Sequence, residues 1–398
     1  MLALEGIKIL DLSAGYPGAF GTQILGDLGA EVINIEGRPG LNLQQTEEKR
    51  VAAYQAVNRN KKSIVLNLKS EEGRGIFYQL AKEADVIVDP FRPGVTKRLG
   101  IDYETISKIN PRIIYCGISG YGQDGPYCDM PGHDVNYLSI AGALGLIGRI
   151  DSQPAIPLNI IADLAGAALH ATIGILTAII ARNKTSKGQY IDISYTDSVI
   201  ALLGATPIAD TYFQDNIVAK RGETYIGGCY PWYAIYETKD GKLITLGCLE
   251  LPLWENLCRA IGREDFIPFH FKPEYRLHKP EGEKWSEISS YLKELFLTRT
   301  RDEWFDLLGP SDVPIGKVYS LDEVFTDPQV LHRGMVVEMD YPGGDKIKQV
   351  GIAIKLSDTP GKVRSLPPLR GEQTDEILFG LGFSQERVDE LRCAGVVS

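Results

Sequence analysis

The sequence predicts a doubly wound α/β fold with a second, smaller α+β region, and three observations carry this prediction. The first third of the chain alternates short β-branched runs with helical segments, the pattern of a parallel sheet with crossover helices. Residues 233–248 form two alternating runs around Lys239-Asp240-Gly241, which is typical of a hairpin. With 398 residues, 44% hydrophobic and 24% charged, the chain has enough apolar material for a large core.

The predicted elements follow one another in β-α order. Apolar runs rich in isoleucine and valine predict strands at residues 8–12, 31–36, 63–68, 85–89 and 112–119. Helical segments are expected between them, at residues 17–28, 71–83 and 103–109. A further strand is expected at 189–197, and strands at 336–341 and 350–357 precede a last helix.

The most apolar stretch, residues 164–181, is about as long as a membrane span. It contains Gly166 and His170 and directly follows Asp163, which favours a buried core helix over a span. We therefore expect no membrane partner.

Composition excludes several classes of function. The net charge is −10 and no block of Lys and Arg could follow a phosphate backbone, so nucleic acid is not an expected partner. The N-terminus has no basic segment followed by an unbroken apolar run, which favours a cytoplasmic protein. The six cysteines form no C-x-x-C pair and have no histidine at metal-ligand spacing, so we expect reduced thiols and no metal site.

A dinucleotide site is the obvious alternative for a doubly wound fold. Gly15 to Gly18 form a turn after the first strand, and Glu36 ends the second strand, where an acidic residue would meet a ribose. The spacing is G-x-x-G, however, and Pro17 removes an amide that could face a pyrophosphate. The sequence therefore disfavours NAD binding.

Asp163 is the sharpest candidate for chemistry, because it opens the most apolar helix of the chain. A carboxylate there is expected to be partly desolvated, and could be a nucleophile, a proton-abstracting base or only a helix cap. The pair His133-Asp134, at a turn before another apolar stretch, is a second candidate. Its alternative is a cap by Asp134 with His133 as a surface residue.

Cations follow or flank several strands of this acidic protein. Residues after the carboxyl ends of parallel strands line the ligand crevice, so cations there suit a phosphorylated ligand. Each of them could instead be a solvated surface residue. The residues concerned are Arg38, Lys61, Lys62, Lys69, Arg92 and Arg98.

Taken together, these motifs resemble the family III CoA-transferase and acyl-CoA racemase superfamily over nearly the full chain. The segments that carry the resemblance are LEGIKILDLS, LGDLGAEVINIE, NRNKKSIVLNLKS, ADVIVDPFRPGVTKRLGID, NPRIIYCGISGYGQDGPY, KGQYIDISYTDSV, IKLSDTP and GEQTDEIL.

The resemblance implies an architecture and a ligand. It implies a Rossmann-like CoA-binding domain at residues 1–200, completed by 330–398, a linker at 201–225 and a small α+β domain at 226–329. Members of the superfamily look like interlocked homodimers that bind acyl-CoA thioesters. A related partner chain is the alternative to a second copy. Coenzyme A is then part of the substrate, with no tightly bound cofactor.

The resemblance also implies roles for single residues. The common aspartate of the superfamily matches Asp163, and the segment GHDVNY is similar to that of the α-methylacyl-CoA racemases, which use its histidine, here His133. Glu250 falls on the glutamate that contacts the racemase histidine. Positions around CoA fall on Leu66, Lys69, Arg98, Asp134 and Tyr137, with Arg38 and Arg92 matching more loosely.

Two activities follow from this resemblance. The first is racemisation of 2-methylacyl-CoA by His133 and Asp163, one proton-transfer group on each face of the substrate carbon, with the amides that begin the Asp163 helix as donors to the enolate oxygen. The second is CoA transfer through a thioester on Asp163, since a GHD segment also occurs in transferases. The G-G-G-G-Q loop of formyl-CoA transferases is replaced by Gly227-Gly228-Cys229-Tyr230-Pro231. A third interpretation is a non-catalytic subunit.

Overall fold

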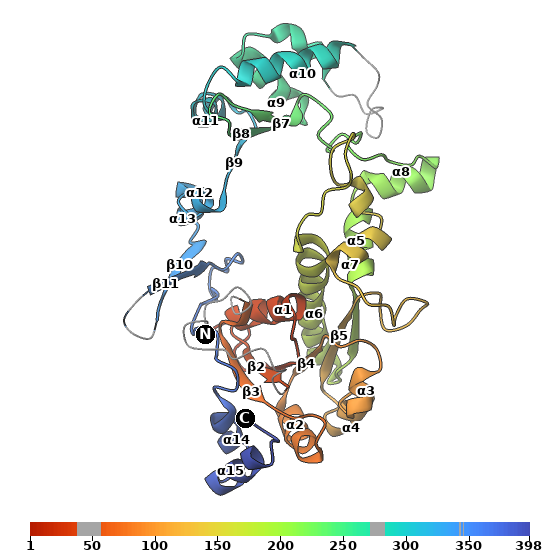
Figure 1. Cartoon of the computed structure of the whole chain (residues 1–398), viewed down its shortest axis with the longest axis vertical. Coiled ribbons are helices and arrows are strands. Elements are labelled where there is room, and N and C mark those ends of the chain that lie inside the picture. The colour runs from red at the N-terminus through yellow and green to blue at the C-terminus, as the bar shows by residue number, and fades with distance from the viewer. Residues whose placement is uncertain (38–56, 271–282, 342–343, 345) are drawn as a thin grey trace. The chain divides into compact units, whose positions relative to one another are not determined.

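A computed structural model describes residues 1–37, 57–270, 283–341, 344 and 346–398 (Figure 1). Contacts divide the chain into two compact units. Unit 1 comprises Met1–Ala141, Leu158–Val199 and Pro328–Ser398, and unit 2 comprises Gly142–Pro157 and Ile200–Asp327. Residues 142–157, which fall in the expected large domain, thus group with unit 2.

Unit 1 is built on a six-stranded sheet whose neighbouring strands all pair in parallel. The strand order is β3-β2-β1-β4-β5-β6, so the order reverses between β1 and β4. A ligand crevice is expected at such a reversal, outside the carboxyl ends of the strands. The strands are β1 (Lys8–Asp11), β2 (Glu31–Glu36), β3 (Lys61–Val65), β4 (Val86–Asp89), β5 (Ile114–Ser119) and β6 (Tyr190–Ser194).

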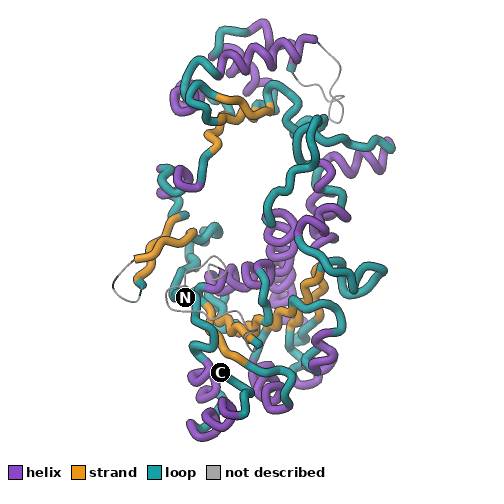
Figure 2. The backbone as a smooth tube through the Cα atoms, viewed as in Figure 1, coloured by secondary structure: helices purple, strands orange, loops and turns teal. Residues whose placement is uncertain are grey.

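Helices cover both faces of this sheet, as a doubly wound fold requires, and Figure 2 shows them on either side of the strands. Alternate strand residues point to opposite faces: Leu10 joins one core with α2 and α4, whereas Ile9 joins another with α1 and α6. The predicted fold class is confirmed. The helices are α1 (Tyr16–Asp27), α2 (Glu71–Glu83), α3 (Val95–Leu99), α4 (Tyr103–Ile109), α5 (Asp134–Ile140), α6 (Leu169–Thr185) and α7 (Tyr195–Gly204).

The apolar helix begins earlier than expected and is not uniform. A π-helical segment, η4 (Ile160–Ala168), runs without a break into α6. The stretch Ile160–Thr185 is long and apolar enough to cross a membrane by length and composition alone. One side of it is nevertheless in the core, because Ala171, Ile175 and Ala178 pack against the sheet.

The C-terminal part of the chain completes unit 1. Helices α14 (Thr374–Gly380) and α15 (Gln385–Cys393) close the core over α2. The side-chain oxygen of Asn60, which has a left-handed φ of 62°, accepts from the amides of Arg364 and Ser365 at 2.6 and 3.1 Å.

One predicted strand is wrong. Strand β10 (Val336–Asp340) pairs with β11 (Lys346–Val350), and residues 351–357 form no strand. Val350 already faces Val336, the first residue of β10, so the chain beyond Val350 has no partner strand in this ribbon. The expected last helix is also two helices, α14 and α15.

Unit 2 has a core of its own around Trp232, Trp254 and Phe296. The predicted hairpin is confirmed as β7 (Tyr233–Glu237) and β8 (Leu243–Gly247), and β9 (Ile315–Val318) extends the sheet beside β8. Its helices include α8 (Pro207–Asp215), which lies in the range of the expected linker, α9 (Leu251–Ala260), α10 (Glu283–Phe296), α11 (Arg301–Leu308) and α12 (Leu321–Val324).

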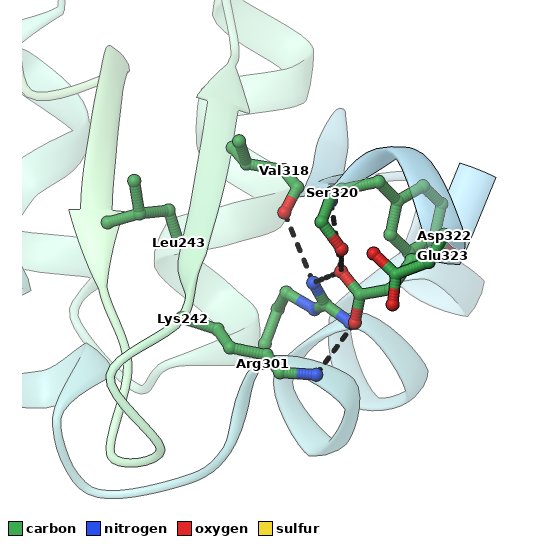
Figure 3. A pocket seen from close by; sticks show the side chains of 8 residues that line it. Lys242, Leu243, Arg301, Val318, Ser320, Asp322 and Glu323 are labelled. Carbon is green, nitrogen blue, oxygen red and sulfur yellow. Dashed lines mark hydrogen bonds and ion pairs between the residues drawn. The ribbon is translucent and has the colours of Figure 1, made fainter.

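A cavity of about 530 Å³ in unit 2 contains none of the predicted site residues (Figure 3). Arg301, with 3% of its side chain exposed, binds Glu323 at 2.8 Å, and Lys242 binds the same carboxylate at 2.7 Å. One carboxylate, that of Glu323, thus holds both cations and ties α11 and α12 to the sheet.

Candidate active site

Asp163 lies on the fourth residue of η4 and is half-buried. Burial raises the pKa of its carboxyl to about 6; the Asn159 side chain and the charge of His133 oppose this shift, and the charge of Asp134 adds to it. The Nδ2 of Asn159 donates to Oδ2 of Asp163 at 3.3 Å. The N-cap position is occupied by Asn159, so the interpretation of Asp163 as an N-cap is wrong.

His133 is exposed and directly precedes α5. Its amide donates to Oδ1 of Asn136 at 3.0 Å, which closes the turn that the GHDVNY segment forms. The charge of His133 lowers the pKa of Asp163, and the residue next to His133, Asp134, accepts from the amide of Asp163 at 2.9 Å. The structure thus brings together the two residues that the sequence singled out, within one compact unit.

Asp134 is 5% exposed and holds the two segments together. Its Oδ2 accepts from the amide of Ala162 at 2.8 Å and from the amide of Asp163 at 2.9 Å. Asp134 therefore caps η4 and not its own helix. This corrects the expectation that those amides donate to an enolate oxygen, because the carboxylate of Asp134 already occupies them.

Tyrosines form one side of the site. Tyr137 donates its hydroxyl to the carbonyl of Gly132 at 2.5 Å, and its ring lies 4.7 Å from that of Tyr195. Burial raises the pKa of Tyr137 to about 12, the charges of Tyr121 and Asp163 add to the rise, and Arg92 opposes it. The charge of Arg92 therefore acts on Tyr137, as does that of Asp163.

The predicted CoA residues have different surroundings. Arg92 and Arg98 are exposed and follow β4, at the reversal of strand order, and Lys69 is exposed ahead of α2. Leu66 is 0% exposed and pairs with Val397, so its side chain lies in the core and not on a binding surface. Arg38 lies outside the described residues.

Two of the cations considered as ligand contacts, Lys61 and Lys62, form ion pairs within the protein. Lys61 is buried and donates to Oδ2 of Asp11 at 3.0 Å, while Lys62 contacts Glu31 and Glu376 at 3.0 and 2.9 Å. Burial lowers the pKa of Lys61, and Asp11 opposes the shift. These two cations are engaged in ion pairs within unit 1.

Glu250 lies in unit 2, where it is exposed at the N-cap position of α9. Burial lowers the pKa of His270 in the same unit, while the hydrogen bond to Cys248 and the charge of Glu250 oppose the shift. A contact between Glu250 and His133 stays a prediction.

Sequence reasoning missed two residues of the site. Asn159 stands four positions before Asp163 in one helical segment, and this spacing could have indicated the contact. Tyr195 affects the site from the start of α7, and no local pattern connects it with Asp163. Among the described residues, no group of three or more His, Cys, Asp or Glu side chains could hold a metal ion.

Comparison with known proteins adds the family. A model of CoA-transferase family III matches residues 4–374. The chain is 31% identical over 397 residues to the alpha-methylacyl-CoA racemase of Homo sapiens, covering 100% of this chain and 98% of the relative. It is 36% identical over 404 residues to the succinyl-CoA:glutarate CoA-transferase of Homo sapiens, covering 99% and 90%. A crystal structure of a CAIB/BAIF family protein from Brucella suis superposes with a TM-score of 0.80, at 29% identity, over 96% of this chain and 99% of that one. The chain therefore belongs to CoA-transferase family III.

Proposed function

We propose that the protein racemises 2-methylacyl-CoA thioesters, with His133 and Asp163 transferring the α-proton. The observation that carries the proposal is the hydrogen bond of 2.9 Å from the amide of Asp163 to the side chain of Asp134, the residue next to His133. Burial in addition raises the pKa of Asp163 to about 6. Racemisation needs two groups that both gain and lose a proton near neutral pH, one on each face of the substrate carbon.

In this reaction one base takes the α-proton, and the electron pair of the C–H bond becomes that of the enolate. The opposite group then returns a proton to the other face of the same carbon. Imidazole is the commonest general acid–base group in enzymes. A carboxyl with a pKa of about 6 is mostly ionised at pH 7. Because pH 7 is only about one unit above this pKa, protonating the carboxylate there costs only about 1.4 kcal/mol.

The CoA moiety is proposed to lie at the carboxyl edge of the sheet. Arg92 and Arg98 are exposed after β4, and the strand order reverses between β1 and β4, where the ligand site of a doubly wound sheet is expected. Arginine is well suited to phosphate because its guanidinium donates two parallel hydrogen bonds. The charge of Arg92 also acts on Tyr137, which connects this edge with the proton-transfer residues.

The test is an NMR measurement of a single 2-methylacyl-CoA stereoisomer incubated with the protein in D₂O. Deuterium incorporation at the α-carbon with loss of chirality is expected for the wild type. His133→Ala and Asp163→Asn are expected to abolish racemisation of both isomers. His332→Ala, at an exposed histidine in α13 (Pro328–His332), is the matched control. Full racemase activity in His133→Ala would refute the two-base mechanism.

CoA transfer is the second candidate, favoured by the 36% identity to a succinyl-CoA:glutarate CoA-transferase. Here a carboxylate oxygen of Asp163 attacks the thioester carbonyl and CoA thiolate leaves, which gives an acyl-aspartyl anhydride. The thiolate then attacks the aspartyl carbonyl and releases the donor acid, which leaves an aspartyl-CoA thioester for the acceptor. An intact-mass increase of CoA less one water, absent in Asp163→Asn, would support transfer.

A homodimer is proposed from the exposed side of α6. Leu169, Ile173 and Ile180 are 41%, 60% and 59% exposed, an apolar row too large to expect on a free surface. A second copy of the chain would cover it, as the resemblance implies. Sedimentation equilibrium is expected to give twice the chain mass, and Ile173→Glu with Ile180→Glu is expected to weaken association. A wild-type monomer at micromolar concentration would contradict the proposal. A cytoplasmic location stays a prediction.

A further inference from the structure

The π-helical segment η4 begins without a cap of its own. The first amides of a helix have no partner within it, and a π-helix leaves one more than an α-helix does. Asn159 holds the N-cap position but makes no side-chain cap hydrogen bond. Two of the unpaired amides, those of Ala162 and Asp163, donate instead to Oδ2 of Asp134, which comes from another helix.

Asp134 also ties this segment to the candidate histidine. It is the first residue of α5, directly after His133, and α5 packs against η4. A carboxylate in the first turn of a helix is stabilised by the helix dipole. The backbone of Asp163 is therefore joined to that of His133 through one hydrogen bond, the side chain of Asp134 and one peptide bond, and the amide of Ala162 adds a second hydrogen bond to the same oxygen.

The other oxygen of Asp134 strengthens this interpretation. Oδ1 is buried and has no hydrogen-bond partner within the part of the chain that the structure describes. Only Oδ2 of Asp134 is bound by hydrogen-bond donors. Because the carboxylate is buried, little water screens its negative charge from the neighbouring groups. Its effect on Asp163 is to raise the pKa of that carboxyl, in addition to the larger effect of burial.

We propose that Asp134 is a positioning residue, which caps the segment carrying Asp163 and sets that carboxylate against His133. This inference rests on the proposed function but assigns Asp134 a different role from the CoA contact that the resemblance implies. At 5% exposed, with Oδ2 bound to two amides, Asp134 has little surface to offer a ligand.

The titratable groups around Asp163 come from several elements. Helices α1, α5 and α6 pack against η4, and Tyr195 at the start of α7 also interacts with Asp163. Of these groups, His133 and Asp134 are the ones whose charges shift the pKa of Asp163. The groups on those elements are Tyr16 and Asp27 on α1, His133, Asp134 and Tyr137 at α5, His170, Arg182 and Lys184 on α6, and Tyr195 and Asp197 on α7.

Two substitutions separate the geometric from the electrostatic contribution. Asp134→Asn keeps an acceptor oxygen for the two amides but removes the charge, whereas Asp134→Ala removes both. Asp129→Asn, at an exposed position on the same loop, controls for a general change of charge. Retained melting temperature and circular dichroism establish that each variant folds.

Hydrogen exchange tests the cap without any need for activity. Peptides spanning residues 158–165 are expected to exchange faster in Asp134→Ala, at the amides of Ala162 and Asp163, and at the wild-type rate in Asp134→Asn and Asp129→Asn. Unchanged exchange in Asp134→Ala would overturn the proposed cap. This readout stands even if the wild type catalyses neither racemisation nor transfer, an outcome that would refute only the proposed function.

Kinetics test the consequence for Asp163 in the reactions that it begins as a carboxylate, which are removal of the α-proton from the isomer that presents this proton to it and attack on a thioester. In Asp134→Asn the acid limb of kcat/KM is expected to move to lower pH, because removing a nearby negative charge favours the ionised carboxylate. In Asp134→Ala, kcat is expected to fall about 100-fold with little change in KM, as for a misplaced catalytic group. An unmoved acid limb would mean that the charge of Asp134 does not act on Asp163. A raised KM with a normal kcat would mean that Asp134 binds substrate. Either result would overturn the proposal.

Discussion

Asp89→Asn replaces a buried carboxylate at the end of β4 with an amide of the same shape. Burial raises the pKa of Asp89 from 3.8 to about 6, and the residue is 5% exposed. Its oxygens accept from the amide of Phe91 at 2.9 Å and from the hydroxyl of Tyr115 at 3.3 Å, which oppose the shift. Because burial disfavours the charged form, the ionised side chain destabilises the folded protein at neutral pH.

The expected change in stability follows from the raised pKa of Asp89. A pKa about two units above the unfolded value corresponds to about 3 kcal/mol at pH 7. The amide makes weaker hydrogen bonds than the carboxylate, which offsets about 1 kcal/mol. We therefore expect Asp89→Asn to raise the free energy of unfolding by about 2 kcal/mol at pH 7. The folded pKa lies above the unfolded one, so the penalty grows as pH rises from about 4 to about 6, and the gain should shrink on acidification.

Urea unfolding at pH 7 and pH 4.5 measures this gain. Far-UV circular dichroism reports on the whole chain, whereas all four tryptophans lie within residues 200–327 and report on unit 2. The tryptophan signal therefore serves as a reference within the same molecule. Asp129→Asn is the matched control at an exposed carboxylate. A variant no more stable than the wild type at pH 7, or a gain that is independent of pH, would refute the reasoning.

Three further predictions follow from single contacts. With a pKa of about 6 for Asp163, the rate of α-proton exchange is expected to fall roughly tenfold from pH 7 to pH 5, and a flat profile would contradict its role as base. In the wild type, Arg59 binds the buried carboxylate of Asp27 at 2.6 and 3.0 Å. Arg59→Ala removes this cation, so the free energy of unfolding in urea should fall by about 3–5 kcal/mol, and a fall below about 1 kcal/mol would contradict this. Gly188→Ala places a Cβ 1.8 Å from the carbonyl oxygen of Ile113, so the melting temperature should fall by several degrees, and an unchanged value would mean that the backbone yields freely.

The sheet could be predicted from the sequence because its inner strands are buried on both faces. A strand such as β4, with every residue buried, appears as an unbroken apolar run between turn residues. The segment 350–357 has the same appearance and is not a strand after Val350, because the ribbon offers no further partner. Local composition indicates which residues can form a strand, whereas pairing depends on distant parts of the chain.

The site shows the same division between local and distant information. His133 and Asp163 stand in segments with recognisable spacing, so they could be found one by one. The role of Asp134 could not, because the amides it binds lie 28 and 29 residues further along the chain. Lys61 was misjudged for a similar reason, since its partner Asp11 is 50 residues away and turns an apparent ligand cation into a buried ion pair.

The family alone leaves the reaction open for a reason that lies in the substrate. The α-carbon and the carbonyl carbon of a thioester are bonded neighbours, about 1.5 Å apart, as for any single carbon–carbon bond of this kind. A carboxylate that is a base toward the first becomes a nucleophile toward the second after a shift of that size, so the proposed role of Asp163 is compatible with both reactions. The proposed role of His133 is not, because only racemisation needs a proton returned to the opposite face. The effect of His133→Ala on each reaction, and not the presence of Asp163, therefore distinguishes the two activities.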